Sequence, residues 1–305
     1  MPLMESGILA RIRDLLPGGG ELLDDCGALP PTPPGQTLLV TTDLMESGQH
    51  FRLDWHPPEL LARKLLAVNL SDLDASGARP FGYTLTLALG PEVAAPWLDI
   101  FLASLAAVSR ETGVRVLGGD TVGRPVGLGL GLTAFGFAPR WLRRDGLQPG
   151  DGIFTDQRPG ASLRGLRKLQ AGQRWDPANP DPELAAHLAP RPNLGLGLSL
   201  AQIPEVHACL DLSDGLSRDL RNLAEASGLS IILDQGLNED ALRGGEDYAR
   251  CFGSSLDQAE LEARLGLSLV PVGKVLPRGN APLLTYDEGA LRPLPDFSFD
   301  HFGRP

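Results

Sequence analysis

The sequence predicts an α/β protein of the α+β type that consists of two αβ domains. Three observations lead to this prediction: strand-like and helix-like segments alternate along the 305 residues, hydrophobic residues make up 42% of them, and Ala138-Pro139 separates two such alternations. We therefore expect an N-terminal domain over residues 1–138 and a C-terminal domain over residues 139–305.

The expected elements of the first domain follow from side-chain periodicity and from end signals. Apolar residues at helical spacing, closed by glycine or proline, predict helices over residues 4–16, 57–77 and 95–113. Runs of β-branched or alternating apolar residues predict strands over residues 37–42, 83–89, 114–117 and 126–137.

The last of these strands has glycine on one face, because three leucines alternate with three glycines over residues 127–132. Glycine leaves a strand face without side-chain packing, so something large or another backbone is expected there, and a subunit interface is one candidate. The apolar phase then moves to Phe135 and Phe137, which indicates a bulge or a strand buried on both faces.

The second domain repeats the alternation of strands and helices. Its patterns predict strands over residues 208–212, 229–234, 247–252 and 268–276, and a helix over residues 215–227. Residues 173–192 are rich in Pro, Asp and Asn, so we expect an insert dominated by loops.

Composition excludes several classes of function. The formal net charge is −11, which argues against sequence-independent binding to nucleic acid and against docking on anionic lipid. Cys26, Cys209 and Cys251 form no CxxC motif, so neither a disulfide framework nor a zinc ribbon is expected. The N-terminus is typical of an amphipathic helix, and the longest apolar stretch, residues 126–138, is too short to span a bilayer. We expect a cytoplasmic protein.

Several aspartates lie at the ends of apolar segments, next to Thr, Ser or Gly. Loops at the carboxyl ends of strands are where αβ folds bind ligands, so the set indicates a binding site. Its members are Asp25 in LLDDCGAL, Asp43 in VTTDLM, Asp72 in VNLSDLD, Asp120 in VLGGDT, and Asp211 and Asp214 in LDLSDGL.

Taken singly, most of these residues have a purely structural explanation. Asp25 could lie in a solvated turn, Asp43 could cap a turn, and Asp214 could be the N-cap of the helix that follows it. Asp72 differs, because it shares a stripe with apolar helix positions that should be buried, and a buried carboxylate requires a cation or an arginine. Asp74 faces elsewhere and is expected to be solvated.

Taken together, the carboxylates point to magnesium and phosphate. If they converge at about 5 Å, each pair repels by roughly 3 kcal/mol at an effective dielectric near 20, so divalent cations are needed. Oxygen ligands favour magnesium over zinc, and this many carboxylates would serve more than one ion. Several magnesium ions over a polyphosphate indicate phosphoryl transfer, although no GxxxxGK[ST] motif occurs.

In order and spacing, these segments resemble the thiamine-monophosphate kinase family, which belongs to the superfamily of aminoimidazole ribonucleotide synthetase and selenophosphate synthetase. VNLSDL, DLSDGL and GGEDY carry the resemblance, and VTTDLMESGQHF, VLGGDT and FDHF support it nearly end to end. The resemblance implies the aminoimidazole ribonucleotide synthetase-like fold, with N-terminal sheets paired in a homodimer. It also implies magnesium-assisted transfer of the ATP γ-phosphate directly onto thiamine monophosphate, giving thiamine diphosphate.

The resemblance also implies roles for single residues. It implies magnesium ligands at Asp25, Thr42, Asp43, Asp72, Asp120, Asp211 and Asp214. It implies ATP contacts at Gly119, Arg144 and Ser213, and thiamine monophosphate contacts at His50, Glu246 and Phe299. No general base is assigned, because an acceptor phosphate that is already ionised needs none.

Other functions stay open at this point. The chain departs from the family where Glu21, Leu22 and Leu23 stand in place of Gly-Ile-Gly and where residues 234–244 form a shorter stretch, so a non-catalytic paralogue that binds nucleotide or thiamine phosphate is one alternative. Asp156 also replaces a glycine of the family. Another ATP-dependent kinase or synthetase of the superfamily is a second, and a metal-dependent phosphatase or nuclease is a third. Cys26 has no lysine near it, which disfavours a selenophosphate synthetase, and the C-terminal FGRP disfavours a hydrogenase maturation factor.

Overall fold

The computed structural model describes residues 4–22, 26–287, 290–295 and 297, and these form a mixed α/β structure with two sheets. Two units can be distinguished. We call Met1–Leu73, Arg79–Ala138 and Arg174–Pro180 the N-terminal unit, and Asp74–Ala78, Pro139–Gln173 and Asp181–Pro305 the C-terminal unit. No helix in the described part of the chain is long and apolar enough to cross a membrane.

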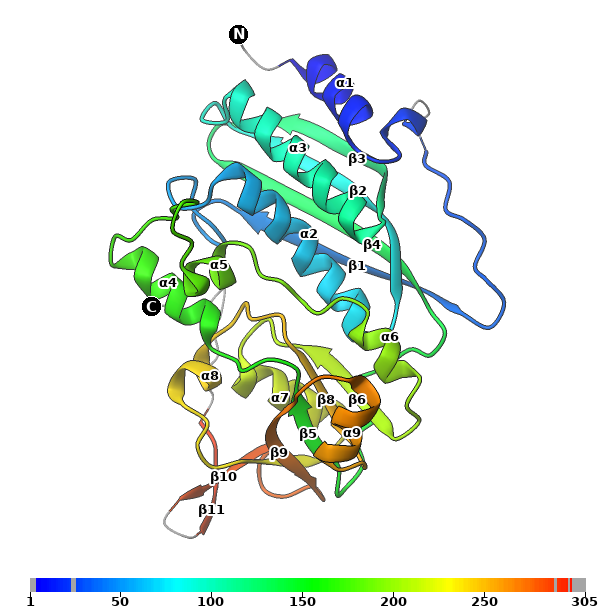
Figure 1. Cartoon of the computed structure of the whole chain (residues 1–305), viewed down its shortest axis with the longest axis vertical. Helices are drawn as coiled ribbons and strands as arrows, with labels where there is room; N and C mark the ends of the chain where they lie inside the picture. The colour runs from blue at the N-terminus through cyan, green and yellow to red at the C-terminus, as the bar shows by residue number, and fades with distance from the viewer. Residues whose placement is uncertain (1–3, 23–25, 288–289, 296, 298–305) are drawn as a thin grey trace. The chain divides into compact units, whose positions relative to one another are not determined.

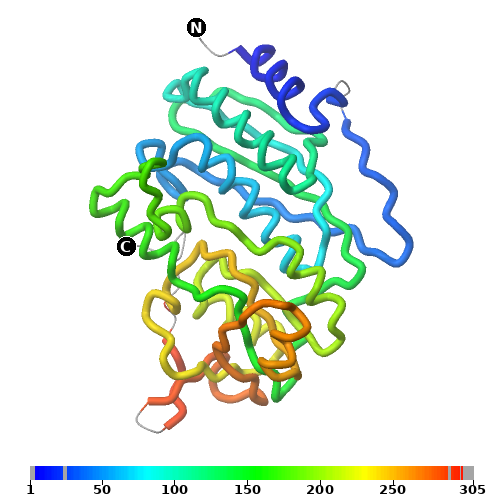
Figure 2. Tube along the Cα trace, viewed as in Figure 1, coloured from blue at the N-terminus to red at the C-terminus, as the bar shows by residue number. Residues whose placement is uncertain are grey.

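The N-terminal unit is a four-stranded sheet with helices on one face (Figure 1). Its strands follow the order β1 (Thr37–Glu46), β4 (Leu128–Ala138), β2 (Arg79–Leu89) and β3 (Arg115–Gly123). β4 is antiparallel to β1 and β2, and β3 is parallel to β2. The helices are α1 (Glu5–Leu15), α2 (Pro58–Ala75) and α3 (Ala95–Thr112), with a 3₁₀ turn η1 at Gly19–Glu21. Figure 2 shows the chain that leads from residue 26 into β1.

The leucine face of β4 forms the core of this unit, as its alternation predicts. Leu128, Leu130 and Leu132 are buried under the helices. Pairing with β1 continues without interruption to Ala138, so Phe135 and Phe137 share the face of Gly129 and no phase shift occurs in β4. The irregular pairing lies instead in the partner strand β2, between Pro80 and Gly82.

The glycine face of β4 has a local explanation. A Cβ atom at Gly129 would lie 2.7 Å from Glu46 Oε1 and 2.9 Å from an Arg124 guanidinium nitrogen. Glu46 and Arg124 form an ion pair of 2.5 Å, so this pair crosses β4 at the glycine. On the same helix-free face, the apolar side chains of Val40 and Leu44 are 63% and 59% exposed.

The C-terminal unit is built on a seven-stranded sheet of order β11-β10-β7-β9-β5-β8-β6. The strands are β5 (Gly152–Thr155), β6 (Val206–Asp211), β7 (Ser230–Leu233), β8 (Arg250–Ser254), β9 (Val270–Leu276), β10 (Leu283–Asp287) and β11 (Ala290–Pro293). The helices are α4 (Ala161–Gln170), α5 (Pro182–Leu188), α6 (Leu196–Ala201), α7 (Leu216–Ala226), α8 (Glu239–Arg243) and α9 (Gln258–Leu265). The apolar stripe of α7 belongs to the core against the sheet.

Three details differ from the sequence-based expectations. The insert over residues 173–192 contains α5, which begins where the Asp181 side chain accepts hydrogen bonds from the backbone N–H groups of Glu183 and Leu184. β1 and β3 continue well past their apolar runs, so Asp43 and Asp120 lie within strands rather than behind them. β8 begins three residues later than expected, at Arg250, because residues 246–248 form a turn.

Candidate active site

Asp43 and Asp72 lie on the helix-covered side of the N-terminal sheet. The Thr41 hydroxyl donates a 2.6 Å hydrogen bond to Asp72 Oδ2, which joins α2 to β1. Asp43 is two positions after Thr41 in β1, so its side chain points to the same face. Asp72 is half-buried at the end of a stripe whose leucines are fully buried, and Thr41 supplies a partner for its carboxylate.

Thr42 and Asp120 lie on the opposite, helix-free face of the same sheet. Thr42 is paired with Thr133, and their hydroxyl oxygens are 3.0 Å apart. Asp120 is paired with the exposed Thr86, and one of its carboxylate oxygens accepts a 2.9 Å hydrogen bond from the Thr121 N–H. The sheet therefore divides the predicted metal ligands of this unit between its two faces.

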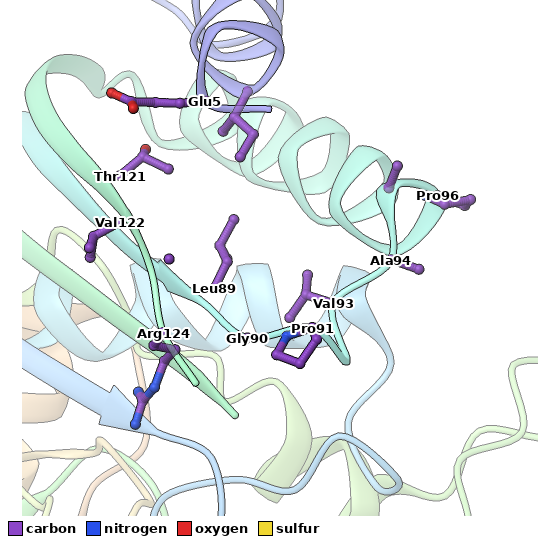
Figure 3. Close-up of a pocket in the computed structure, with 13 residues that line it drawn as sticks. Glu5, Leu89, Gly90, Pro91, Val93, Ala94, Pro96, Thr121, Val122 and Arg124 are labelled. Atoms are coloured by element: carbon purple, nitrogen blue, oxygen red, sulfur yellow. The ribbon is translucent and has the colours of Figure 1, made fainter. Parts of the chain in front are cut away.

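A pocket opens at the carboxyl ends of the parallel strands β2 and β3 (Figure 3). Its volume is about 610 Å³, within the range of small-molecule sites. The pocket is lined by Glu5 and Ile8 of α1, by residues 89–91 and 93–96, and by residues 121–124. Gly119 lies just before this last segment, and a Cβ atom there would be only 2.0 Å from the Leu85 carbonyl oxygen, so no side chain fits.

His50 lies in the turn that follows β1. Its Nδ1 atom accepts a 3.0 Å hydrogen bond from the Glu46 backbone N–H, and the residue is half-buried. In a neutral ring the proton must then be on Nε2, so this nitrogen is the one that can donate to a ligand.

The acidic residues of the C-terminal unit gather in one strand–turn–helix segment. Asp211 ends β6 and is 3% exposed, and Asp214 lies in the turn before α7. The N-cap of α7 is Gly215, which has no side-chain hydrogen bond, so the explanation of Asp214 as a helix cap is wrong. The Asp214 N–H donates instead to Asp219 Oδ2 in the first turn of α7, at 3.1 Å.

Asp219 is a candidate site residue that the sequence reasoning missed. It is 3% exposed, and burial, followed by the carboxylates of Asp214 and Asp211, raises the pKa of its carboxyl to about 8. A signal was available, because Asp219 stands three residues after Leu216 and four before Leu223, on the buried stripe of α7. A divalent cation would offset the negative charge that Asp214 and Asp211 place around the Asp219 carboxyl.

Glu246 lies beside this acidic turn. Its backbone N–H donates a 2.8 Å hydrogen bond to the Ser213 carbonyl, and its φ angle of 63° is unusual for a residue with a side chain. Arg144, which is exposed, lowers the pKa of Asp219 by its positive charge. Ser213 and Glu246 are thus close to each other, and Arg144 is near enough for its charge to act on Asp219.

Asp74 contradicts the expectation that it is solvated. It is 1% exposed, and its carboxylate is 3.1 Å from Nε of Arg250, a residue with no exposed surface. It also accepts hydrogen bonds from the N–H groups of Gly195 at 2.6 Å and Gly197 at 3.1 Å. The helical period correctly placed Asp74 on a different face of α2 from Asp72. It could not show that the backbone around Gly195 and Gly197 covers that face.

The predicted residues are thus brought together in part. Among the described residues, no three His, Cys, Asp or Glu side chains lie close enough to hold a metal ion. Asp25 and Phe299 lie outside the described residues. The described donors carry oxygen only, which suits magnesium. Burial is the main cause of the raised pKa of Asp219, and the carboxylates of Asp214 and Asp211 add a negative potential that a divalent cation would offset.

Comparisons with known proteins connect these segments to one family. Residues 23–138 match the family model AIR synthase related protein, N-terminal domain. The thiamine-monophosphate kinase of Salmonella typhimurium strain LT2 is 39% identical over 267 residues, which cover 81% of this chain and 80% of that protein. The crystal structure of thiamine-monophosphate kinase from Stenotrophomonas maltophilia K279a has a TM-score of 0.75 and 33% identity, covering 93% and 96% of the two chains. AaThiL complexed with AMPPCP and TMP has a TM-score of 0.76 and 25% identity, covering 99% of each chain.

Proposed function

Because the chain belongs to the thiamine-monophosphate kinase family, we propose that it transfers the γ-phosphoryl group of ATP to thiamine monophosphate. An oxygen of the acceptor phosphate attacks the γ-phosphorus, the bond from this phosphorus to the β,γ-bridging oxygen breaks, and thiamine diphosphate and ADP result. The observation that carries the proposal is the acidic segment with the buried Asp211 and Asp219 and the partly exposed Asp214, in a chain that matches this family over most of its length. AaThiL complexed with AMPPCP and TMP supports both substrates.

We propose that magnesium binds to the oxygen donors of both units. Bound magnesium would neutralise the charge that makes one phosphate resist attack by another. The proposed ligands are Asp25, Thr42, Asp43, Asp72, Asp120, Asp211 and Asp214. The raised pKa of Asp219 supports this assignment in the C-terminal unit, because the carboxylates of Asp214 and Asp211 contribute to it after burial.

ATP is assigned to residues around the two acidic regions. Gly119 lets a phosphate approach the backbone, Ser213 offers a hydroxyl, and the Arg144 guanidinium is suited to phosphate oxygens. The pocket of about 610 Å³ beside Thr121 is proposed for the nucleoside part of ATP, since Ile8, Leu89 and neighbouring apolar side chains would cover a base.

Thiamine monophosphate is assigned to His50, Glu246 and Phe299. The His50 Nε2–H group can donate to the acceptor phosphate, because Nδ1 already accepts from the backbone. The Glu246 carboxylate suits the positive charge of a thiazolium ring. No residue needs to act as a general base, because the acceptor phosphate is ionised before it attacks.

The test is an incubation of the protein with ATP, magnesium and thiamine monophosphate, with thiamine diphosphate measured by fluorescence after oxidation to thiochrome. We expect product that requires all three components. ATP binding by calorimetry without any product would overturn the kinase assignment in favour of another acceptor or of a non-catalytic paralogue. Release of inorganic phosphate without thiamine monophosphate would instead indicate a phosphatase.

We also propose that residues 1–138 form the ATP- and magnesium-binding domain that pairs in a homodimer, while residues 139–305 form the second domain. The open face of the N-terminal sheet supports this pairing, since Val40 and Leu44 expose about three-fifths of their surface beside the stacked rings of Phe81 and Phe137. Val40→Asp should reduce the mass measured by light scattering to one chain of 32.5 kDa. Ile100→Asp on α3 is the matched control, because Ile100 is 50% exposed away from this face. A dimer that survives Val40→Asp would exclude the interface.

A further inference from the structure

Three separate segments of the C-terminal unit meet at the buried ring of His187. His187 lies on α5 and is 4% exposed. Its Nδ1 atom is 3.1 Å from Oγ of Ser162, in the first turn of α4, and 3.3 Å from Oε2 of Glu246. Figure 1 shows α4 and α5 side by side, as their contacts require. Both contacts involve Nδ1, so a side chain at position 187 can keep them only if it places a donor at the position of this nitrogen.

The turn that carries Glu246 is held in a strained conformation. Glu246 and Tyr248 have φ angles of 63° and 50°, in the left-handed region that residues with a side chain rarely adopt. Such a turn persists only where its surroundings hold it. Here the Glu246 N–H donates to Ser213, and the Asp247 carboxylate accepts from the N–H groups of Gly160 at 2.6 Å and Ser162 at 3.1 Å.

The carboxylate of Glu246 therefore contacts the His187 ring and is partly exposed to solvent. Its side chain is 28% exposed, whereas the ring of His187 is almost fully buried. A carboxylate accepts hydrogen bonds only, so Nδ1 of His187 must carry the proton that holds it. Ser162 Oγ lies within reach of the same N–H group.

We propose that His187 is a positioning residue, which orients the Glu246 carboxylate through Nδ1 so that its exposed part meets the cationic thiazolium ring of the acceptor. This rests on the proposed function, because the acceptor is the one named there. His187 itself is too deeply buried to meet a ligand, so it acts through Glu246.

The contact between α4 and α5 does not depend on His187. Arg164 and Lys168 of α4 form ion pairs with Glu183 at 2.5 Å and 2.9 Å. A Cβ atom at Gly165 would lie 2.0 Å from the Glu183 carbonyl oxygen, so the two backbones pack closely there. Loss of the His187 hydrogen bonds should therefore leave the helix pair in place, and a change in substrate binding can be separated from a change in fold.

Two variants separate orientation from packing. Asparagine places its amide nitrogen near the position of Nδ1, whereas glutamine places it near Nε2. We expect His187→Gln to raise the KM for thiamine monophosphate about 10-fold or more, with kcat and the KM for ATP unchanged, because an oriented charge-assisted hydrogen bond is lost. We expect His187→Asn to stay within about 2-fold of the native KM. Thermal unfolding of both variants reports any loss of fold.

Glu246→Gln completes the experiment. In that background His187→Gln should have little further effect on the KM, because the two residues act as one unit. Equal kinetics for His187→Asn and His187→Gln, or full additivity with Glu246→Gln, would overturn the proposal.

A native protein without thiamine diphosphate formation would overturn the proposed function, and with it the acceptor named here. The hydrogen bond itself would then be judged by ¹⁵N NMR of the histidine rings. A His187 Nδ1 signal that does not respond to Glu246→Gln would show that His187 does not hold this carboxylate.

Discussion

The two units of the molecule hold their carboxylates in opposite surroundings. In the N-terminal unit, Asp43 and Asp72 are half-buried and Asp120 is exposed, and the three come from β1, α2 and β3. In the C-terminal unit, Asp211 and Asp219 are each 3% exposed and lie within one strand–turn–helix segment. The difference is therefore one of burial as well as of spacing along the chain.

This difference in burial determines whether a carboxylate needs a compensating group within its own unit. An exposed carboxylate keeps its hydration until a ligand arrives, so it costs the fold little. A buried carboxylate needs a proton, a cation or an arginine at once. Asp219 meets this requirement with a raised pKa, and Asp74 meets it with Arg250.

The largest change in stability is expected when the buried cation of the C-terminal unit, Arg250, is removed. Arg250→Leu should lower the free energy of unfolding by about 3–5 kcal/mol, because Asp74 and Asp156 stay buried without their cation. Adding Asp74→Ala and Asp156→Ala should restore most of this loss. Urea unfolding measures the free energy of unfolding of the single and the triple variant. A triple variant that is no more stable than Arg250→Leu would disprove that the unpaired carboxylates cause the loss.

The same variant should show a characteristic pH dependence. Burial raises the pKa of Asp74 above its ordinary 3.8, while Arg250 opposes this rise, so the pKa should increase further in Arg250→Leu. A carboxyl with a raised folded-state pKa stabilises the fold fully below its unfolded-state pKa and loses that contribution as pH rises through the folded-state pKa. Arg250→Leu should therefore lose more stability between pH 4 and pH 7 than the native protein does.

The next effect compares one proposed magnesium ligand from each unit. Asp43→Asn and Asp211→Asn should each reduce thiamine diphosphate formation on the order of 10²–10³-fold, since each removes charge that neutralisation of phosphate requires. Without divalent cation, Asp43→Asn should leave the free energy of unfolding within about 0.5 kcal/mol. Asp211→Asn should raise it by about 1 kcal/mol, because a repulsion between buried carboxylates is gone.

The kinetics and stability of these two variants can also contradict the assignments made here. Near-native turnover in either would remove that residue from the proposed metal site. Equal changes in unfolding free energy would show that burial does not distinguish the two units.

The smallest expected effect concerns a neutral buried pair in the N-terminal unit. The hydroxyl groups of Tyr83 and Ser109 are 2.9 Å apart, and burial raises the pKa of Tyr83 to about 12. Tyr83→Phe should cost about 1 kcal/mol near neutral pH, because one hydrogen bond is lost. The native protein should lose roughly 3 kcal/mol as pH rises from about 10 to 12, and Tyr83→Phe should lose less.

Absorbance at 295 nm gives an independent check of that pKa. The difference between the native protein and Tyr83→Phe should titrate with a midpoint near 12. A midpoint near 10, the ordinary value for tyrosine, would show that the ring is not buried as described.

Long, strongly periodic segments were predictable and short ones were not. The patterns of α2, α3 and α7 set their faces correctly, because each repeats its period over at least three turns. In β4 the alternation of leucine and glycine set the buried face, but the phase shift expected at Phe135 and Phe137 was wrong. Helices of five to eight residues, such as α5 and α8, carry too few repeats to stand out. His187 was missed for this reason, since α5 lies within a segment read as a loop.

The sequence by itself determined the fold class, the alternation of apolar elements, the acidic segments and the family, because residue chemistry and order are local properties. Only the tertiary structure decided that Thr42 and Asp120 lie on the face opposite to Asp43, because strand length and register choose the face of every side chain. It also decided that Asp74 is buried against Arg250. That pairing joins residues far apart in the chain, and no local pattern contains the backbone that covers them.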